Sequence, residues 1–165
     1  MHAALQAGRV AVITGSASGI GLAAARAFAS QGLHIVLADL PTNLSSASQS
    51  IASEFPDIKC LPVETDVSQF SALEALKKKV DSEFAGKEVG VLMFNAGTSA
   101  PSATFAREGL EQATLRANYD KILNTNLWGV INGVQAFLPD LVKQKSPSAV
   151  ICTGSKQVYR MRRWN

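Results

Sequence analysis

Short apolar runs alternate along the chain with segments in which apolar residues recur at helical spacing. The apolar runs lie within residues 9–14, 34–38, 58–67, 89–94 and 149–153, and the helical segments within residues 20–31, 43–55, 70–84 and 110–142. The run from Val89 to Phe94 contains no polar residue, which is typical of a strand with helices on both faces. This alternation predicts a parallel α/β sheet, and we expect the last helical segment to break or end near Pro139.

The composition is typical of one folded domain. Of the 165 residues, 47% are apolar and 18% are charged, which supports a buried core and excludes wholesale disorder. No apolar run approaches the roughly 20 residues that cross a bilayer, and the first residues do not resemble a signal peptide. Cys60 and Cys152 are too few for a disulfide framework or a zinc site, so we expect no metal and a cytoplasmic location.

The net charge of +3 does not indicate a nucleic-acid partner, because the excess lies at the chain end. Lys156, Arg160, Arg162 and Arg163 all fall within the last ten residues. Without them, acidic residues outnumber basic ones. We therefore expect neither a nucleic-acid nor a membrane partner.

A glycine-rich turn follows the first apolar run, where residues 14–21 read Thr-Gly-Ser-Ala-Ser-Gly-Ile-Gly. Gly15 can take the conformation of a tight turn, Gly19 lets the backbone approach a pyrophosphate, and Gly21 lets the next helix pack near the strand. The free N–H groups and the dipole of that helix attract phosphates. The pattern predicts a dinucleotide site, with a ligand-free turn or a methyltransferase-type site as alternatives.

Asp39 directly follows the second apolar run. Its carboxylate can accept hydrogen bonds from the hydroxyls of an adenosine ribose, and it would repel a 2′-phosphate. Residues 16–18 contain no Lys or Arg that could neutralise such a phosphate. NAD is therefore favoured over NADP as the cofactor, although Asp39 could also be a plain turn residue before Pro41.

The turn and four later positions resemble the short-chain dehydrogenase/reductase family. The family's Thr-Gly-x-x-x-Gly-x-Gly pattern is matched at residues 14–21, and its Asn-Ala-Gly motif at residues 95–97. Asp66 with Val67 resembles its adenine-contacting site, Asn126 its helix asparagine, and Ser155 its catalytic serine. The matches come in family order over nearly the whole chain, and together they displace the methyltransferase alternative.

The resemblance implies a fold and a set of site residues. The fold is a Rossmann-type doubly wound parallel α/β sheet of about five strands, without the family's later strands, within residues 1–157. The implied cofactor-binding residues are Gly15, Ser18, Gly19, Ile20, Gly21, Asp39, Asp66, Val67, Asn95, Ala96 and Gly97. Asn95 would hold neighbouring strand ends through its side chain, and Gly97 would leave room for a ribose; ordinary strand-end turn residues are the alternative.

The implied catalytic residues are Asn126 and Ser155. Inside an apolar helix, Asn126 needs a partner, which the resemblance implies to be a backbone carbonyl and a water of a proton relay. A structural asparagine with satisfied hydrogen bonds is the alternative. Ser155 would place its hydroxyl near the carbonyl oxygen of a substrate.

One part of the family pattern is missing. The family's catalytic Tyr-x-x-x-Lys is imitated only by Tyr159 and Arg163, which stand too close to Ser155. We expect residues 158–165 to be a basic tail without family likeness, an alternative or out-of-frame ending.

These features together predict an NAD-dependent oxidoreductase of alcohols or carbonyls that is impaired by the missing segment. A non-catalytic NAD(H)-binding fragment or truncated isoform is the alternative. The strand at residues 149–153 would form an exposed apolar edge, so we expect low solubility or self-association. A homo-oligomer could form through the helical region at residues 110–142.

Overall fold

The computed structural model describes residues 2–99 and 111–154, in which five strands form one sheet. The strands are β1 (Val10–Thr14), β2 (His34–Asp39), β3 (Cys60–Glu64), β4 (Val89–Phe94) and β5 (Ala149–Cys152). Their order is β3-β2-β1-β4-β5, and each neighbouring pair is parallel. Because the strand order reverses between β1 and β4, the sheet is doubly wound, and the predicted Rossmann-type α/β fold is confirmed.

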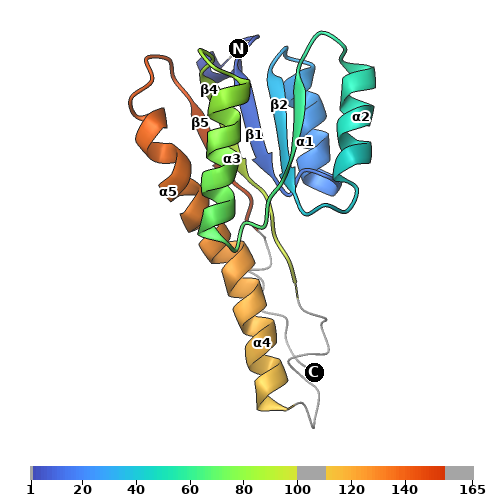
Figure 1. The fold of residues 1–165 in the computed structure, drawn as a ribbon, viewed down its shortest axis with the longest axis vertical. Coiled ribbons are helices and arrows are strands. Elements are labelled where there is room, and N and C mark those ends of the chain that lie inside the picture. The colour runs from blue at the N-terminus through green and yellow to red at the C-terminus, as the bar shows by residue number, and fades with distance from the viewer. Residues whose placement is uncertain (1, 100–110, 155–165) are drawn as a thin grey trace, which may run out of the picture.

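Helices cover both faces of this sheet. The α-helices are α1 (Gly19–Ala29), α2 (Leu44–Glu54), α3 (Phe70–Glu83), α4 (Gln112–Leu123) and α5 (Gly129–Leu141), and all but α4 pack on the sheet. Helices α1 and α2 pack on one face, and α3 and α5 pack on the other (Figure 1). Alternate residues of β1 face the two helical layers. Ala11 and Ile13 pack against α1 and α2, and Val10 and Val12 pack against α3 and α5, as a strand buried on both faces requires. No helix within the described ranges is long and apolar enough to cross a membrane.

The long helical segment expected at residues 110–142 contains an irregularity, but it does not lie at Pro139. Helix α5 ends at Leu141, near Pro139 as expected, but Pro139 lies inside the helix and does not break it. Because Pro139 stands in the last turn, its missing N–H leaves the earlier turns intact. The irregularity is a π-helical turn, Asn124–Trp128, which joins α4 to α5 and which the sequence pattern did not predict.

Strand β5 is an edge of the sheet within the described residues, where it pairs only with β4. Its apolar side chains are accordingly uncovered, with Val150 46% exposed and Ile151 38% exposed. This agrees with the apolar edge expected at residues 149–153. The predicted tail at residues 158–165 lies outside the described residues.

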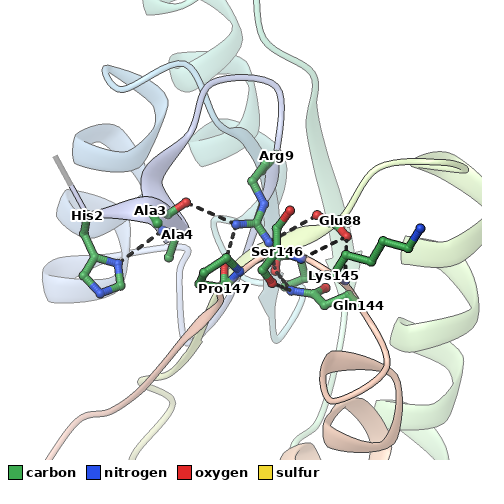
Figure 2. A network of polar contacts seen from close by, with 10 residues as sticks. His2, Ala3, Ala4, Arg9, Glu88, Gln144, Lys145, Ser146 and Pro147 are labelled. Atoms are coloured by element: carbon green, nitrogen blue, oxygen red, sulfur yellow. Dashed lines mark hydrogen bonds and ion pairs between the residues drawn. The ribbon is translucent and has the colours of Figure 1, made fainter.

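A buried arginine joins several segments near the amino-terminal ends of the strands (Figure 2). The Arg9 side chain is 8% exposed and lies just before β1. Its guanidinium donates to the carbonyl oxygens of Ala3 (3.3 Å), Val89 (3.1 Å) and Pro147. The carboxylate of Glu88 lies 3.8 Å away. One side chain therefore ties the chain start, the start of β4 and the turn before β5 together.

The same region contains a change of register. The pairing of β1 with β4 shifts by one residue at Gly90, opposite the step from Val10 to Ala11. An added Cβ at Gly90 would overlap the carbonyl oxygen of Ala4, so only glycine fits this bulge. Because a shift of one residue moves every later residue of the strand, the register at the far end of β4 depends on this bulge.

We expect the substitution Arg9→Met to lower the free energy of unfolding by about 2–4 kcal/mol, because buried carbonyl groups lose a charged donor. Arg26→Met is the matched control, since Arg26 pairs with Glu54 on the exposed surface and should contribute less than about 1 kcal/mol. Urea denaturation followed by circular dichroism measures both. Equal losses in the two variants would contradict the assigned role of Arg9.

Candidate functional site

A cleft of about 480 Å³ opens where the strands end at their carboxyl edge. In an open doubly wound sheet, ligands bind at this edge, beside the point where the strand order reverses. Most of the predicted cofactor residues line the cleft: Gly15, Ser18, Gly19, Ile20, Asp39, Asp66, Val67, Asn95, Ala96 and Gly97. The fold thus brings together residues from four separate loops that the sequence analysis had grouped by motif alone.

The glycine-rich turn connects β1 to α1, and each of its glycines has its own geometric reason. Gly15 has φ +64°, and an added Cβ would lie 2.6 Å from the Cα of Ala96. Gly21 is not among the lining residues; its Cβ would overlap the Gly15 carbonyl oxygen and approach the Asn95 amide nitrogen to 2.7 Å. Gly19 has φ +52° and open space beside it. Gly15 and Gly21 are therefore packed closely against neighbouring backbone, whereas the space beside Gly19 is open at the cleft.

The first turn of α1 presents donors to the cleft. The helix starts at Gly19, and its preceding residue Ser18 makes no side-chain capping bond. The first N–H groups of a helix have no acceptor within the helix, so they are available to an anion. Ile20 lies in the same turn and is 69% exposed, which leaves an apolar side chain at the cleft wall.

Backbone donors orient the carboxylate of Asp39 at the end of β2. Its Oδ2 accepts from the N–H of Ala17 at 2.7 Å, and its Oδ1 accepts from the N–H of Leu40 at 2.8 Å. A carboxylate oxygen can accept more than one hydrogen bond, so both oxygens keep capacity for ligand hydroxyls. The first of these bonds also connects Asp39 to the glycine-rich turn.

Asp66 and Val67 form the next part of the wall, after β3. Asp66 is exposed, and its Oδ1 accepts from the N–H and the hydroxyl of Ser68 at 3.0 and 2.8 Å. Val67 is 5% exposed and packs against the start of α5 at Gly129. The carbonyl oxygen of Val67 accepts from the buried side chain of Asn132 at 3.1 Å. This loop is thereby fixed to the helix that follows the π-helical turn.

Asn95 joins the ends of three strands. Its Nδ2 donates to the carbonyl oxygen of Gly15 at 2.9 Å, and its Oδ1 accepts from the hydroxyl of Thr153 at 3.1 Å. The hydroxyl oxygen of Thr14 accepts from the N–H groups of Asn95 and Ala96 at 3.0 and 3.1 Å. The side chain thus has the strand-holding hydrogen bonds that its motif led us to expect.

Asn126, which we expected inside an apolar helix, lies in the π-helical turn between α4 and α5 and is exposed. Its Oδ1 accepts from the N–H of Thr98 at 2.7 Å, and its Nδ2 donates to the carbonyl oxygen of Thr98 at 2.9 Å. A backbone carbonyl is therefore a partner, but it belongs to the loop after β4. Ser155 lies outside the described residues, one position after Gly154.

Several lining residues were not predicted: Leu40, Thr65, Lys121, Thr125 and Thr153. Leu40 and Thr65 directly adjoin predicted residues, so their position next to a motif was the signal that could have found them. Lys121 and Thr125 come from the helical region, and they precede Gly129 at intervals of four residues. That spacing was the signal that could have found them. No group of three or more potential metal ligands gathers in the part of the chain that the structure describes.

The family model for short chain dehydrogenases matches residues 9–163. Among curated relatives, galactitol 2-dehydrogenase of Agrobacterium fabrum is 35% identical over 121 residues, covering 73% of this chain and 42% of that protein. The 3-oxoacyl-[acyl-carrier-protein] reductase FabG of Thermotoga maritima is 28% identical over 152 residues, covering 92% of this chain and 58% of that protein. The chain therefore spans about half the length of these relatives.

Solved structures agree with this match. A short-chain dehydrogenase/reductase from Burkholderia phymatum, in complex with NAD, has a TM-score of 0.77 at 29% identity, covering 90% of this chain and 50% of that one. L-sorbose reductase from Gluconobacter frateurii, with NADPH and L-sorbose, has a TM-score of 0.65 at 31% identity, covering 82% and 48%. The fold and cleft define a Rossmann-type dinucleotide-binding class of protein. Within that class, the chain belongs to the short-chain dehydrogenase/reductase family.

Proposed function

We propose that this chain binds an adenine dinucleotide and is part of an oxidoreductase that acts on an alcohol or carbonyl compound. The turn between β1 and α1 carries the proposal. A Cβ at Gly15 or Gly21 would collide with neighbouring backbone, whereas the space beside Gly19 is open toward the cleft. This cradle suits a pyrophosphate resting against the free N–H groups of α1.

The remaining cleft residues fit the other parts of such a cofactor. We assign the pyrophosphate to Gly15, Ser18, Gly19 and Ile20, and the packing beneath it to Gly21. We assign the adenosine ribose to Asp39, the adenine to Asp66 and Val67, and the second ribose to Asn95, Ala96 and Gly97. All of these except Gly21 line the one cleft, which supports a single extended ligand.

We further propose NAD as the cofactor, in preference to NADP. The solved relatives include one with NAD and one with NADPH, so the family alone leaves this choice open. The carboxylate of Asp39 is fixed at the cleft by two backbone donors and would repel a 2′-phosphate. Residues 16–18 supply no compensating cation.

The bound nicotinamide supplies hydride chemistry at its C4 atom, and the protein positions the reactants. Asn126 is proposed to hold a water of a proton relay while its side chain is fixed by the backbone of Thr98. Ser155 is proposed to hydrogen-bond the oxygen of the substrate. The names of two relatives, a galactitol dehydrogenase and an L-sorbose reductase, support a small alcohol or carbonyl compound as substrate.

A non-catalytic NAD(H)-binding module is the second candidate. The cleft assembles residues from the loops after β1, β2, β3 and β4, and those assigned to a ligand are all assigned to the cofactor. Loss of a general acid/base lowers a rate by about 10²–10⁴-fold, whereas binding does not require that group. Binding without turnover would therefore distinguish this module from an active dehydrogenase.

We also propose that two copies associate through the helical region at residues 110–142, in a reducing compartment such as the cytoplasm. Large apolar side chains are exposed there on neighbouring turns: Leu123, Leu127, Trp128 and Ile131 are 48%, 50%, 51% and 40% exposed. Exposed apolar side chains in such number are typical of interaction surfaces. The unpaired thiols of Cys60 and Cys152 support the reducing compartment.

We expect Gly19→Val to reduce NADH affinity by at least about tenfold, because the new side chain would occupy the open space at the proposed pyrophosphate position. Gly86→Val is a matched control, since Gly86 also has positive φ (+77°) and open surroundings but lies after α3, away from the cleft. The measurement is the fluorescence titration of NADH. An equal loss of affinity in both variants would contradict the assignment.

Asp39→Asn is expected to reverse the cofactor preference, because it removes the negative charge and keeps the shape of the side chain. We expect the ratio of NADH to NADPH affinity to fall by about tenfold or more. Asp57→Asn, in the exposed turn before β3, is the control for a general change of charge. A ratio that stays within twofold of the unaltered chain would refute the role of Asp39.

A further inference from the structure

The cleft contains one cation among its described lining residues, Lys121 of α4. The other charged side chains in that lining are the carboxylates of Asp39 and Asp66. The side chain of Lys121 makes no hydrogen bond or ion pair with any described residue. Lys77, by contrast, is held by Asp140 on α5 at 2.6 Å. An unpaired ammonium group beside a cleft is available to a ligand.

The placement of Lys121 follows from the helical stripe to which it belongs. Lys121, Thr125, Gly129 and Gly133 recur at intervals of four residues, so they share one face of the helical region. A Cβ at Gly133 would overlap the ring of Phe94, and a Cβ at Gly129 would lie 2.7 Å from Val67 Cγ2. The stripe therefore faces the sheet at Gly133 and the loop after β3 at Gly129.

Helix α4 continues this stripe beyond the sheet. In Figure 1, α4 extends past the carboxyl ends of the strands, away from the packed body of α5. Thr125 and Lys121, which precede α5 along the chain, both line the cleft. The π-helical turn between α4 and α5 contains Thr125 and Asn126, so one local irregularity places a cleft residue and the Thr98-paired asparagine side by side.

The wall on which Lys121 lies belongs to one half of the proposed ligand. Gly129 contacts Val67, which with Asp66 is assigned to the adenine. Thr125 and Lys121, which precede Gly129 in the stripe, extend the same wall of the cleft. The assigned pyrophosphate adjoins α1, and the assigned second ribose adjoins the loop after β4, which the helical region contacts through Asn126. Lys121 therefore faces the adenosine 5′-phosphate half.

We propose that Lys121 is a binding residue for the adenosine 5′-phosphate half of the dinucleotide. Its ammonium group donates to an acceptor of that half. This inference rests on the proposed function, because it needs an adenine nucleotide in the cleft.

The test compares Lys121→Met with the unaltered chain for binding of 5′-AMP, ADP-ribose and NADH by calorimetry. All three ligands contain the same half, so we expect their affinities to fall by one common factor of about five to ten. Lys121→Arg, which keeps the charge, should recover most of the loss. Lys78→Met on the exposed surface of α3 removes the same charge away from the cleft and should change no affinity beyond about twofold.

Two results would overturn this assignment while leaving the proposed function standing. One is an unchanged affinity for 5′-AMP in Lys121→Met. The other is a loss confined to NADH, which would place the lysine at the nicotinamide half. If the unaltered chain binds none of the three ligands, the proposed function fails and the inference fails with it.

Discussion

Close contact between the glycine-rich turn and the end of β4 determines the geometry of the whole cleft. The carbonyl oxygen of Gly15 accepts from Asn95, and Gly21 passes so near to both that no side chain fits. This contact brings the start of α1 to the point where the strand order reverses. The donors of that helix and the residues after β2, β3 and β4 consequently face one space.

Contacts at the amino-terminal ends of the strands, opposite the cleft, also support this arrangement. Arg9 ties the start of β4 to the turn before β5, and the bulge at Gly90 sets the register of β4 against β1. A one-residue slip there would turn the strand residues to opposite faces. Asn95 would then lose its position beside Gly15. The site thus depends on packing at both ends of the same strands.

Local pattern predicted much of this molecule. The bounds of β4 and the turn at residues 14–21 follow from an uninterrupted apolar run and from glycine spacing, and both are present in the structure. The contacts of Arg9 with Pro147 and of Asn126 with Thr98 join residues far apart in sequence, so no local pattern could predict them. The four-residue spacing of Lys121 before Gly129 is visible in the sequence, but only packing at Gly129 and Gly133 shows which way that face of the helix is turned.

The central claim is that a pyrophosphate rests against the N–H groups that open α1. A crystal structure of this chain grown with NADH tests it most directly. We expect pyrophosphate oxygens within hydrogen-bonding distance of backbone nitrogens between Gly15 and Gly21, and ribose hydroxyls on the carboxylate of Asp39. Well-ordered crystals with saturating NADH in which the dinucleotide lies elsewhere, or is not bound, would contradict it.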